Sequence, residues 1–268
     1  MTTGAVDMEA GLCHGRDMRW IVSLGLVWIA ACGPEGGTRP DVPRGKVPEA
    51  MAPETRVDGK PEVKPGDPGG ANTALERRLA AAGLVAVTPG PGLRVALVYA
   101  TARNFTGRAL YDDLPRCWLR PEAARRLADA AARLRARRPE LALWVADCTR
   151  PVSVQRELWR VHPNPAHVAD PTRGTSAHNH GCAVDVTLAT DAGGETLELG
   201  TGIDEFAAGE KLTVTHEARL CREGTLPAAA CANRRLLRAV MTEAGFGVYE
   251  GEWWHFSGCD KGRYPAVE

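Results

Sequence analysis

The sequence contains Ser176-Ala177-His178-Asn179-His180-Gly181-Cys182-Ala183-Val184-Asp185 and, near its C-terminus, Glu252-Trp253-Trp254-His255. His178, Asp185 and His255 together supply two imidazoles and one carboxylate. Three protein ligands of this kind, with a fourth position left for water, are typical of a catalytic zinc site, whereas a structural site has four protein ligands. The two stretches therefore predict one catalytic Zn²⁺ per chain.

The spacing within each stretch predicts how the chain must bend. Gly181 lies between His178 and Asp185, and its backbone freedom allows a loop to enter a strand with both side chains turned to one centre. A regular strand would point Glu252 and His255, three positions apart, to opposite faces. We therefore expect a bend near Gly251 or Glu252. With that bend, the Glu252 carboxylate can accept a proton from a metal-bound water.

The composition indicates one folded domain and a small substrate. The chain has 268 residues, of which 44% are hydrophobic and 25% charged, so it can bury a substantial core. Lys plus Arg and Asp plus Glu balance at 33 each. Because no basic block interleaved with aromatic residues occurs, we expect no nucleic-acid partner. A single catalytic domain is predicted at residues 73–268.

The N-terminal residues have the pattern of an export signal. Met18-Arg19-Trp20 precedes a short apolar run that is too short to span a membrane comfortably. The run ends at Ile29-Ala30-Ala31-Cys32, which resembles a bacterial lipobox. We therefore expect residues 1–32 to be a signal peptide, with residues 1–17 a misassigned start, and Cys32 to carry the lipid anchor. An ordinary signal peptide with an incidental Cys32 is the alternative.

Residues 33–72 are rich in Pro, Gly and charge and contain almost no large apolar side chain. Such a segment cannot bury enough surface to fold, so a disordered tether is predicted. Together with the lipobox, it predicts an enzyme at the periplasmic face of the cell envelope, attached to the membrane only through Cys32.

The remaining cysteines agree with an oxidising compartment. Cys117, Cys148, Cys182, Cys221, Cys231 and Cys259 could form three bridges. Cys221 and Cys231 flank a loop with Gly and Pro and are the one predicted pair, while the other pairings stay open. No CxxC spacing occurs, which argues against a thiolate metal site.

Four segments have the periodicity of amphipathic helices. Pro121 stands at the first turn of one of them, and Asn233 and Gly245 are expected to cap the beginning and end of the last. The predicted helices cover residues 73–83, 121–137, 153–161 and 233–245.

Four shorter segments are rich in β-branched and alternating apolar residues, namely 94–100, 141–147, 183–188 and 254–256. Strands and helices follow one another without a regular βαβ repeat. The sequence therefore predicts an α+β fold, in which a central antiparallel sheet carries the zinc site and helices flank it.

The motif Ser176-x-His178-x-x-Gly181-x-Ala183-x-Asp185, with Glu252-Trp253-Trp254-His255, resembles the signature of the zinc D-alanyl-D-alanine dipeptidases of the vancomycin-resistance type. That group is related to zinc D,D-carboxypeptidases and hedgehog-like domains. The resemblance extends over about residues 94–257 and includes, in order, Tyr99-Ala100-Thr101, Asn104-Phe105-Thr106-Gly107, Thr149-Arg150-Pro151, Gly200 through Asp204, Asn233-Arg234-Arg235 and Gly245-Phe246.

The resemblance implies a role for each matching residue. The zinc ligands would be His178, Asp185 and His255. Glu252 would act as general base and then acid, and Arg150 would stabilise the oxyanion. Asp204 would bind the free amino group of the substrate, with Ser176 and Tyr99 lining that end. His162, His167, His180 and His216 are expected not to bind the metal. Cys148, Cys182 and the tether depart from the pattern of cytoplasmic-type relatives.

The predicted function is hydrolysis of D-alanyl-D-alanine, or of a similar short D-dipeptide, in the cell envelope. One alternative is a D,D-carboxypeptidase that acts on peptidoglycan stem peptides with the same metal chemistry. A further alternative is an inactive, zinc-containing envelope-binding module. The presence of both Glu252 and Arg150 argues against the inactive module.

Overall fold

The computed structural model describes residues 73–268. The predicted signal peptide, the lipid anchor at Cys32 and the tether lie outside the described residues. Among the helices of residues 73–268, none has the length and apolar character needed to cross a bilayer. The α-helices are α1 Ala74–Ala81, α2 Pro121–Arg137, α3 Val152–Val161, α4 Val214–Arg222 and α5 Ala228–Glu243. Short 3₁₀ helices are η1 Val98–Ala100, η2 Ala177–His180, η3 Phe206–Leu212 and η4 Lys261–Arg263.

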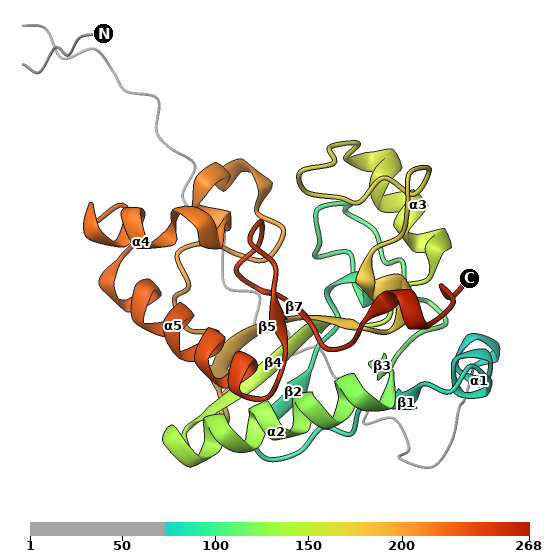
Figure 1. The fold of residues 1–268 in the computed structure, drawn as a ribbon, viewed down its shortest axis with the longest axis horizontal. Coiled ribbons are helices and arrows are strands. Elements are labelled where there is room, and N and C mark those ends of the chain that lie inside the picture. Colours follow the sequence, from blue (N-terminus) through green and yellow to red (C-terminus); the bar gives the residue numbers. More distant parts are fainter. Residues whose placement is uncertain (1–72) are drawn as a thin grey trace, which may run out of the picture. The chain divides into compact units, whose positions relative to one another are not determined.

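The strands form a central sheet and a separate small pair (Figure 1). They are β1 Val85–Ala86, β2 Leu93–Val95, β3 Trp118–Leu119, β4 Leu141–Asp147, β5 Ala183–Thr190, β6 Gly247–Val248 and β7 His255–Ser257. The central sheet has the order β2-β4-β5-β7-β6, and β1 pairs with β3. The α+β class predicted from the sequence is confirmed.

The central sheet is mixed, which corrects the expectation of an antiparallel sheet. The β4–β5, β5–β7 and β6–β7 pairs are antiparallel, but β2 and β4 are parallel. Parallel neighbours need a long crossover connection, and the chain between β2 and β4 provides one that includes α2. The strands that carry the site are all antiparallel pairs.

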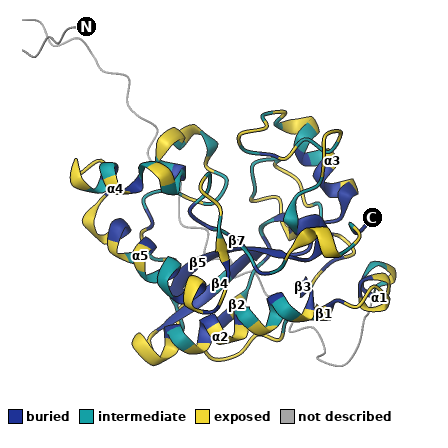
Figure 2. Ribbon diagram, viewed as in Figure 1, coloured by how far each residue is buried: buried dark blue, intermediate teal, exposed yellow. Residues whose placement is uncertain are grey.

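Helices α2 and α5 pack against each other and against the sheet, α2 on β4 and α5 on β5. The apolar side of α2, which includes Leu127 and Leu134, is buried, and its arginines lie on the outside. Val240 and Met241 of α5 are also buried. Figure 2 shows buried strands behind helices whose outer sides are exposed. The two helices therefore form a layer that packs on the strands β4 and β5.

Two elements differ from the sequence prediction by more than two residues at one end. The strand expected at residues 94–100 ends at Val95, and the chain turns into η1, which buries Tyr99. The Tyr99 carbonyl there accepts the N–H groups of Leu110 and Tyr111. The cap expected at Asn233 is wrong, because α5 begins at Ala228 and the Asn233 side chain donates to the Glu198 carbonyl. The alanines that follow Pro227 are strong helix formers and extend the helix.

Three disulfides link the six cysteines of residues 73–268. The predicted Cys221–Cys231 bridge is confirmed and joins α4 to α5. The other two are Cys117–Cys148 and Cys182–Cys259. Cys148 directly follows β4, Cys182 directly precedes β5, and Cys259 lies just beyond β7. Two of the bridges therefore fasten the strand ends that surround the site.

Candidate active site

The three predicted metal ligands come from two neighbouring strands and one short helix. Asp185 of β5 pairs directly with His255 of β7. Directly opposed residues of an antiparallel pair project from the same face of the sheet, so the two side chains meet. His178 lies in η2, whose first N–H groups are capped by Ser176. η2 ends at Gly181, which has a φ of 71° and contacts Leu84 so closely that a Cβ would clash.

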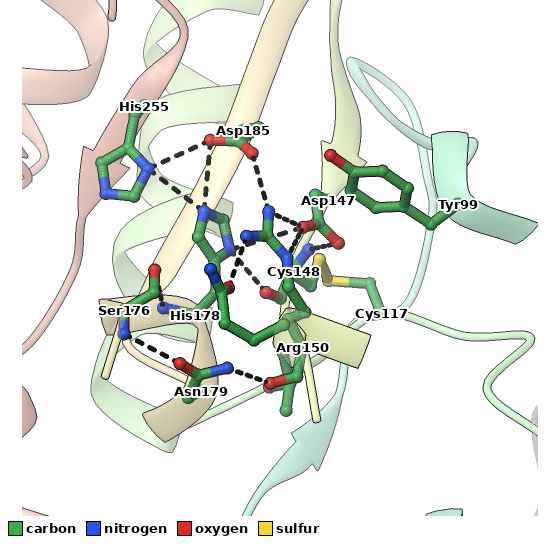
Figure 3. Close-up of polar contacts among 12 residues, drawn as sticks. Tyr99, Cys117, Asp147, Cys148, Arg150, Ser176, His178, Asn179, Asp185 and His255 are labelled. Atoms are coloured by element: carbon green, nitrogen blue, oxygen red, sulfur yellow. Dashed lines mark hydrogen bonds and ion pairs between the residues drawn. A yellow bond between two sulfur atoms is a disulfide. The ribbon is translucent and has the colours of Figure 1, made fainter. Parts of the chain in front are cut away.

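The ligand atoms of these residues form a compact triangle (Figure 3). His178 Nε2 lies 3.1 Å from His255 Nδ1, and Asp185 Oδ1 lies 3.3 Å and 3.2 Å from these two nitrogens. Ligands about 2.0–2.1 Å from a tetrahedral zinc ion are roughly 3.3 Å from one another. The triangle therefore has the size of one face of a zinc coordination shell.

The hydrogen bonds of the ligands also suit a metal. His178 Nδ1 donates to the Cys148 carbonyl at 2.6 Å, which leaves the lone pair of Nε2 directed at the centre of the triangle. Burial alone would raise the pKa of Asp185, but the imidazoles of His178 and His255 outweigh it and lower that pKa. An ionised carboxylate and a neutral imidazole are the forms that bind zinc.

Glu252 lies in the turn between β6 and β7, where the sequence required a bend. Its N–H donates to the Tyr249 carbonyl, and the Trp253 N–H donates to the Leu212 carbonyl. Glu252 lines the same pocket as the three ligands. Burial, reinforced by the negative charges of Asp185 and Asp204, raises its pKa well above the ordinary value. A carboxyl group with a raised pKa can exchange protons near neutral pH.

Arg150 reaches the site from the loop between β4 and α3. Its Nε and Nη2 donate to Asp147 Oδ2 at 3.0 and 2.6 Å, and its Nη1 donates to Gln155 Oε1 at 2.9 Å. Its Nη2 also lies 3.8 Å from Asp185 Oδ2. Burial would lower the pKa of Arg150, but Asp147 and the other acidic neighbours raise it. The guanidinium is therefore a fixed positive charge beside the ligands.

The sequence analysis missed Asp147 and Gln155, the two residues that orient Arg150. Asp147 is fully buried and accepts further hydrogen bonds from the Tyr111 hydroxyl and the Cys148 N–H. Gln155 is buried in α3 and donates to the Ala169 carbonyl. The one available signal for Asp147 was a charged residue at the end of an otherwise apolar strand.

Asp204 and Tyr99 lie together at one end of the pocket. The Tyr99 hydroxyl donates to Asp204 Oδ2 at 2.6 Å. Burial, and next the negative charge of Asp185, raises the pKa of Asp204 to about 6. Within residues 73–268, Asp204 is the only residue other than glycine with a positive φ, 59°. Such a conformation is uncommon and costs free energy, and it often marks a functional position.

All eight predicted site residues line one pocket of about 480 Å³. Ser176 stands in it beside His178, and its hydroxyl accepts the His178 N–H. The four histidines expected not to bind the metal lie outside the ligand triangle. His180 and His216 bond to Thr175 and Thr213, and His162 and His167 bond to each other. His167 nevertheless lines the pocket, which the sequence did not indicate.

Known proteins resemble this chain over the whole region that carries the site. The peptidase M15 family model, described as D-ala-D-ala dipeptidase, matches residues 81–267. The D-alanyl-D-alanine dipeptidase of Escherichia coli (strain K12) is 38% identical over 177 residues, which are 66% of this chain and 84% of that protein. The corresponding protein of Streptomyces coelicolor is 32% identical over 185 residues, 62% of this chain and 86% of that protein. That of Enterococcus faecalis is 28% identical over 190 residues, 65% and 89% of the two chains.

Proposed function

Because this chain belongs to the D-Ala-D-Ala dipeptidase family of M15 peptidases, we propose that it hydrolyses D-alanyl-D-alanine or a similarly short D-dipeptide with one zinc ion. The observation that carries the proposal is the convergence of all eight predicted residues on one pocket. They come from five separate parts of the chain. A complete set of ligands, base, cation and amine anchor supports a hydrolase more strongly than any single residue does.

His178, Asp185 and His255 would hold Zn²⁺, which when bound lowers the pKa of a coordinated water and polarises a carbonyl. The triangle of ligand atoms and the tautomer of His178 support this assignment. Glu252 would take the proton of the attacking water on its carboxylate. It would then deliver that proton to the nitrogen of the leaving amino acid, so that one residue carries out both proton transfers.

Arg150 would stabilise the negative charge that develops on the scissile carbonyl oxygen. Its guanidinium is already oriented by Asp147 and Gln155, so no reorganisation is needed when that charge appears. At the other end, the Asp204 carboxylate would pair with the ammonium group of the substrate, with Tyr99 holding Asp204 in position. Ser176 would line the substrate beside His178.

The experiment that tests this proposal compares the wild type with Glu252→Ala on free D-alanyl-D-alanine, with metal content measured in the same samples. We expect the wild type to release D-alanine and the variant to lose that activity while it keeps its metal. A folded wild type that holds zinc but cleaves no D-amino-acid peptide would instead favour the inactive binding module.

For the location, we propose a lipoprotein that faces the periplasm, on the support of Ile29-Ala30-Ala31-Cys32 in the sequence. There the enzyme would meet short D-peptides derived from peptidoglycan. Cys32→Ser should move the protein from the membrane fraction to the soluble fraction. Continued fractionation of that variant with membranes would contradict the lipid anchor.

A further inference from the structure

Four rings gather at one end of the pocket, and we call them the aromatic cluster: Phe105, His162, His167 and Phe206. Phe206 is central, since its ring stacks on both His162 and His167 with centroids 4.6 Å apart and interplanar angles of 15° and 3°. Phe105 meets Phe206 edge to face at 5.0 Å. Phe105, His167 and Phe206 line the pocket, whereas His162 is not a lining residue and stacks on His167 and Phe206.

The aromatic cluster joins three segments that are far apart in the sequence. A side-chain hydrogen bond of 2.9 Å connects His162 Nε2 and His167 Nδ1. The loop between these histidines is a tight turn, in which the Asn164 carbonyl accepts the His167 N–H. Phe105 lies in a turn that the Asn104 side chain closes through bonds to the Thr101 and Arg108 carbonyls. The rings are therefore held by local structure on each segment.

The aromatic cluster stands directly beside the predicted amine anchor. The Phe206 N–H donates to the Asp204 carbonyl at 2.9 Å, across a tight turn centred on Glu205, which has φ −78° and ψ 64°. Tyr99, which bonds to the Asp204 carboxylate, also meets Phe105 edge to face at 6.2 Å. Asp204 is thus bonded to Tyr99 through its carboxylate and to Phe206 through its backbone, and all three residues line the same pocket.

We propose that the aromatic cluster closes the pocket at its amine end and so restricts the enzyme to peptides with a free amino terminus. The inference rests on the proposed function, in which Asp204 binds the ammonium group of the substrate. An N-acyl group removes the charge that faces Asp204, and it adds atoms where Phe206 and His167 stand. Phe206 and His167 are specificity-determining residues, and His162 is a positioning residue that holds His167.

The test compares D-alanyl-D-alanine with N-acetyl-D-alanyl-D-alanine in binding and in turnover. The informative variants are Phe206→Ala and His167→Ala. Phe206→Leu, which keeps most of the ring's volume, and His216→Ala, which removes a hydrogen-bonded histidine outside the pocket, are the matched controls. Unfolding temperature and metal content establish that each variant is folded.

We expect the wild type to prefer the free dipeptide by at least about 100-fold in kcat/KM, because a site built for a polar group rejects a substrate that lacks it. Phe206→Ala and His167→Ala should reduce this preference at least about tenfold, chiefly through a lower KM for the acetylated peptide. Both controls should keep the preference of the wild type.

Three results would overturn the inference. Folded variants that keep the dipeptide activity and gain none on the acetylated peptide would overturn the closing role alone and leave the proposed function intact. A wild type that cleaves both peptides equally well would show that no closure exists and would favour a D,D-carboxypeptidase. A wild type that neither binds nor cleaves either peptide would overturn the proposed function, and this inference with it. Should Phe206→Ala fail to fold, the half-buried loop residue His167 carries the test.

Discussion

At the scale of single residues, a substitution of Arg150 distinguishes a role in catalysis from a role in metal binding. If its guanidinium stabilises charge that develops only during the reaction, Arg150→Ala should lower kcat by roughly 100- to 1,000-fold and change KM much less. Arg150→Lys should restore activity only in part, because a point charge cannot replace the planar fork that pairs with Asp147. Steady-state kinetics on D-alanyl-D-alanine measure both effects.

The control for this prediction removes the buried partner as well. Arg150→Ala alone leaves the Asp147 carboxylate buried without a cation, which destabilises the fold. Arg150→Ala with Asp147→Asn removes that unpaired charge. The loss of turnover should persist in the double variant. If Arg150→Ala keeps its turnover and only unfolds more easily, Arg150 is a structural ion-pair residue.

The ionised form of Asp204, which is needed to bind the substrate amine, should lower the free energy of unfolding. Its pKa of about 6 lies above the ordinary 3.8, so the protonated form contributes stability below pH 3.8 that is lost as pH rises through about 6. Asp204→Asn should therefore raise the free energy of unfolding by roughly 1–3 kcal/mol at pH 8, with no gain near pH 4. Chemical denaturation of chelator-treated protein across this pH range measures the difference.

The same variant should bind D-alanyl-D-alanine more weakly at pH 8, because an amide cannot neutralise the ammonium group. If Asp204→Asn is less stable than the wild type at pH 8, the claim that the ionised Asp204 carboxylate destabilises the fold is wrong. If the KM of Asp204→Asn is unchanged, Asp204 does not bind the ammonium group of the substrate.

Residues that carry chemistry could be found from the sequence, but the residues that orient them could not. Two compact motifs contain residue types that predict a metal site, namely His178, Asp185, Glu252 and His255. Asp147 accepts hydrogen bonds from Arg150, Tyr111 and the Cys148 N–H, and the bonds from Arg150 and Tyr111 depend on how the loops fold back on the sheet. No local pattern contains that information.

At the scale of elements, a disulfide near the site should contribute more to stability and activity than a remote one. Cys182–Cys259 spans 77 residues and joins the start of β5 to the chain beyond β7. Cys221–Cys231 spans 10 residues and belongs to a small separate cluster between α4 and α5. Loop-closure entropy alone assigns about 4.5 kcal/mol to the first bridge and about 2.7 kcal/mol to the second.

Replacing both cysteines of each bridge by serine compares the two. Loss of Cys182–Cys259 should lower the free energy of unfolding more and should also reduce kcat/KM, because the bridge joins the start of β5 to the chain beyond β7, and these paired strands carry Asp185 and His255. Loss of Cys221–Cys231 should leave kcat/KM close to that of the wild type. Equal losses of activity in the two variants would show that the bridge beside the site has no positioning role.

The elements themselves were predictable where packing and local pattern agree. Residues 121–137 and 141–147 match α2 and β4, because one long apolar face and one long apolar run leave no alternative. The prediction that Asn233 caps the last helix was wrong because the alanines before it extend α5, and the prediction took no account of their helix propensity. The parallel β2–β4 pair depends on the direction of a crossover, which no local pattern records.

For the whole molecule, the family, the α+β class and the dipeptidase reading, rather than the D,D-carboxypeptidase alternative, followed from the sequence, but the residues that would enclose the amine end of the pocket did not. Both enzymes would use the same ligands, base and cation. In the inference proposed above, the difference lies in the enclosure of Asp204, which depends on Phe105, His162, His167 and Phe206 meeting in space. Only the folded chain brings those three segments together.

The central claim is that one zinc ion, held by His178, Asp185 and His255, supports hydrolysis of D-alanyl-D-alanine in the pocket that contains Glu252. The most direct measurement determines zinc content and hydrolysis in the same samples of the wild type, His178→Ala and Glu252→Ala, before and after chelation. We predict one zinc per chain in the wild type and in Glu252→Ala, loss of zinc from His178→Ala, and activity only in the wild type, abolished by chelation and restored by Zn²⁺. Full zinc content in His178→Ala, or hydrolysis that survives removal of the metal, would contradict the claim.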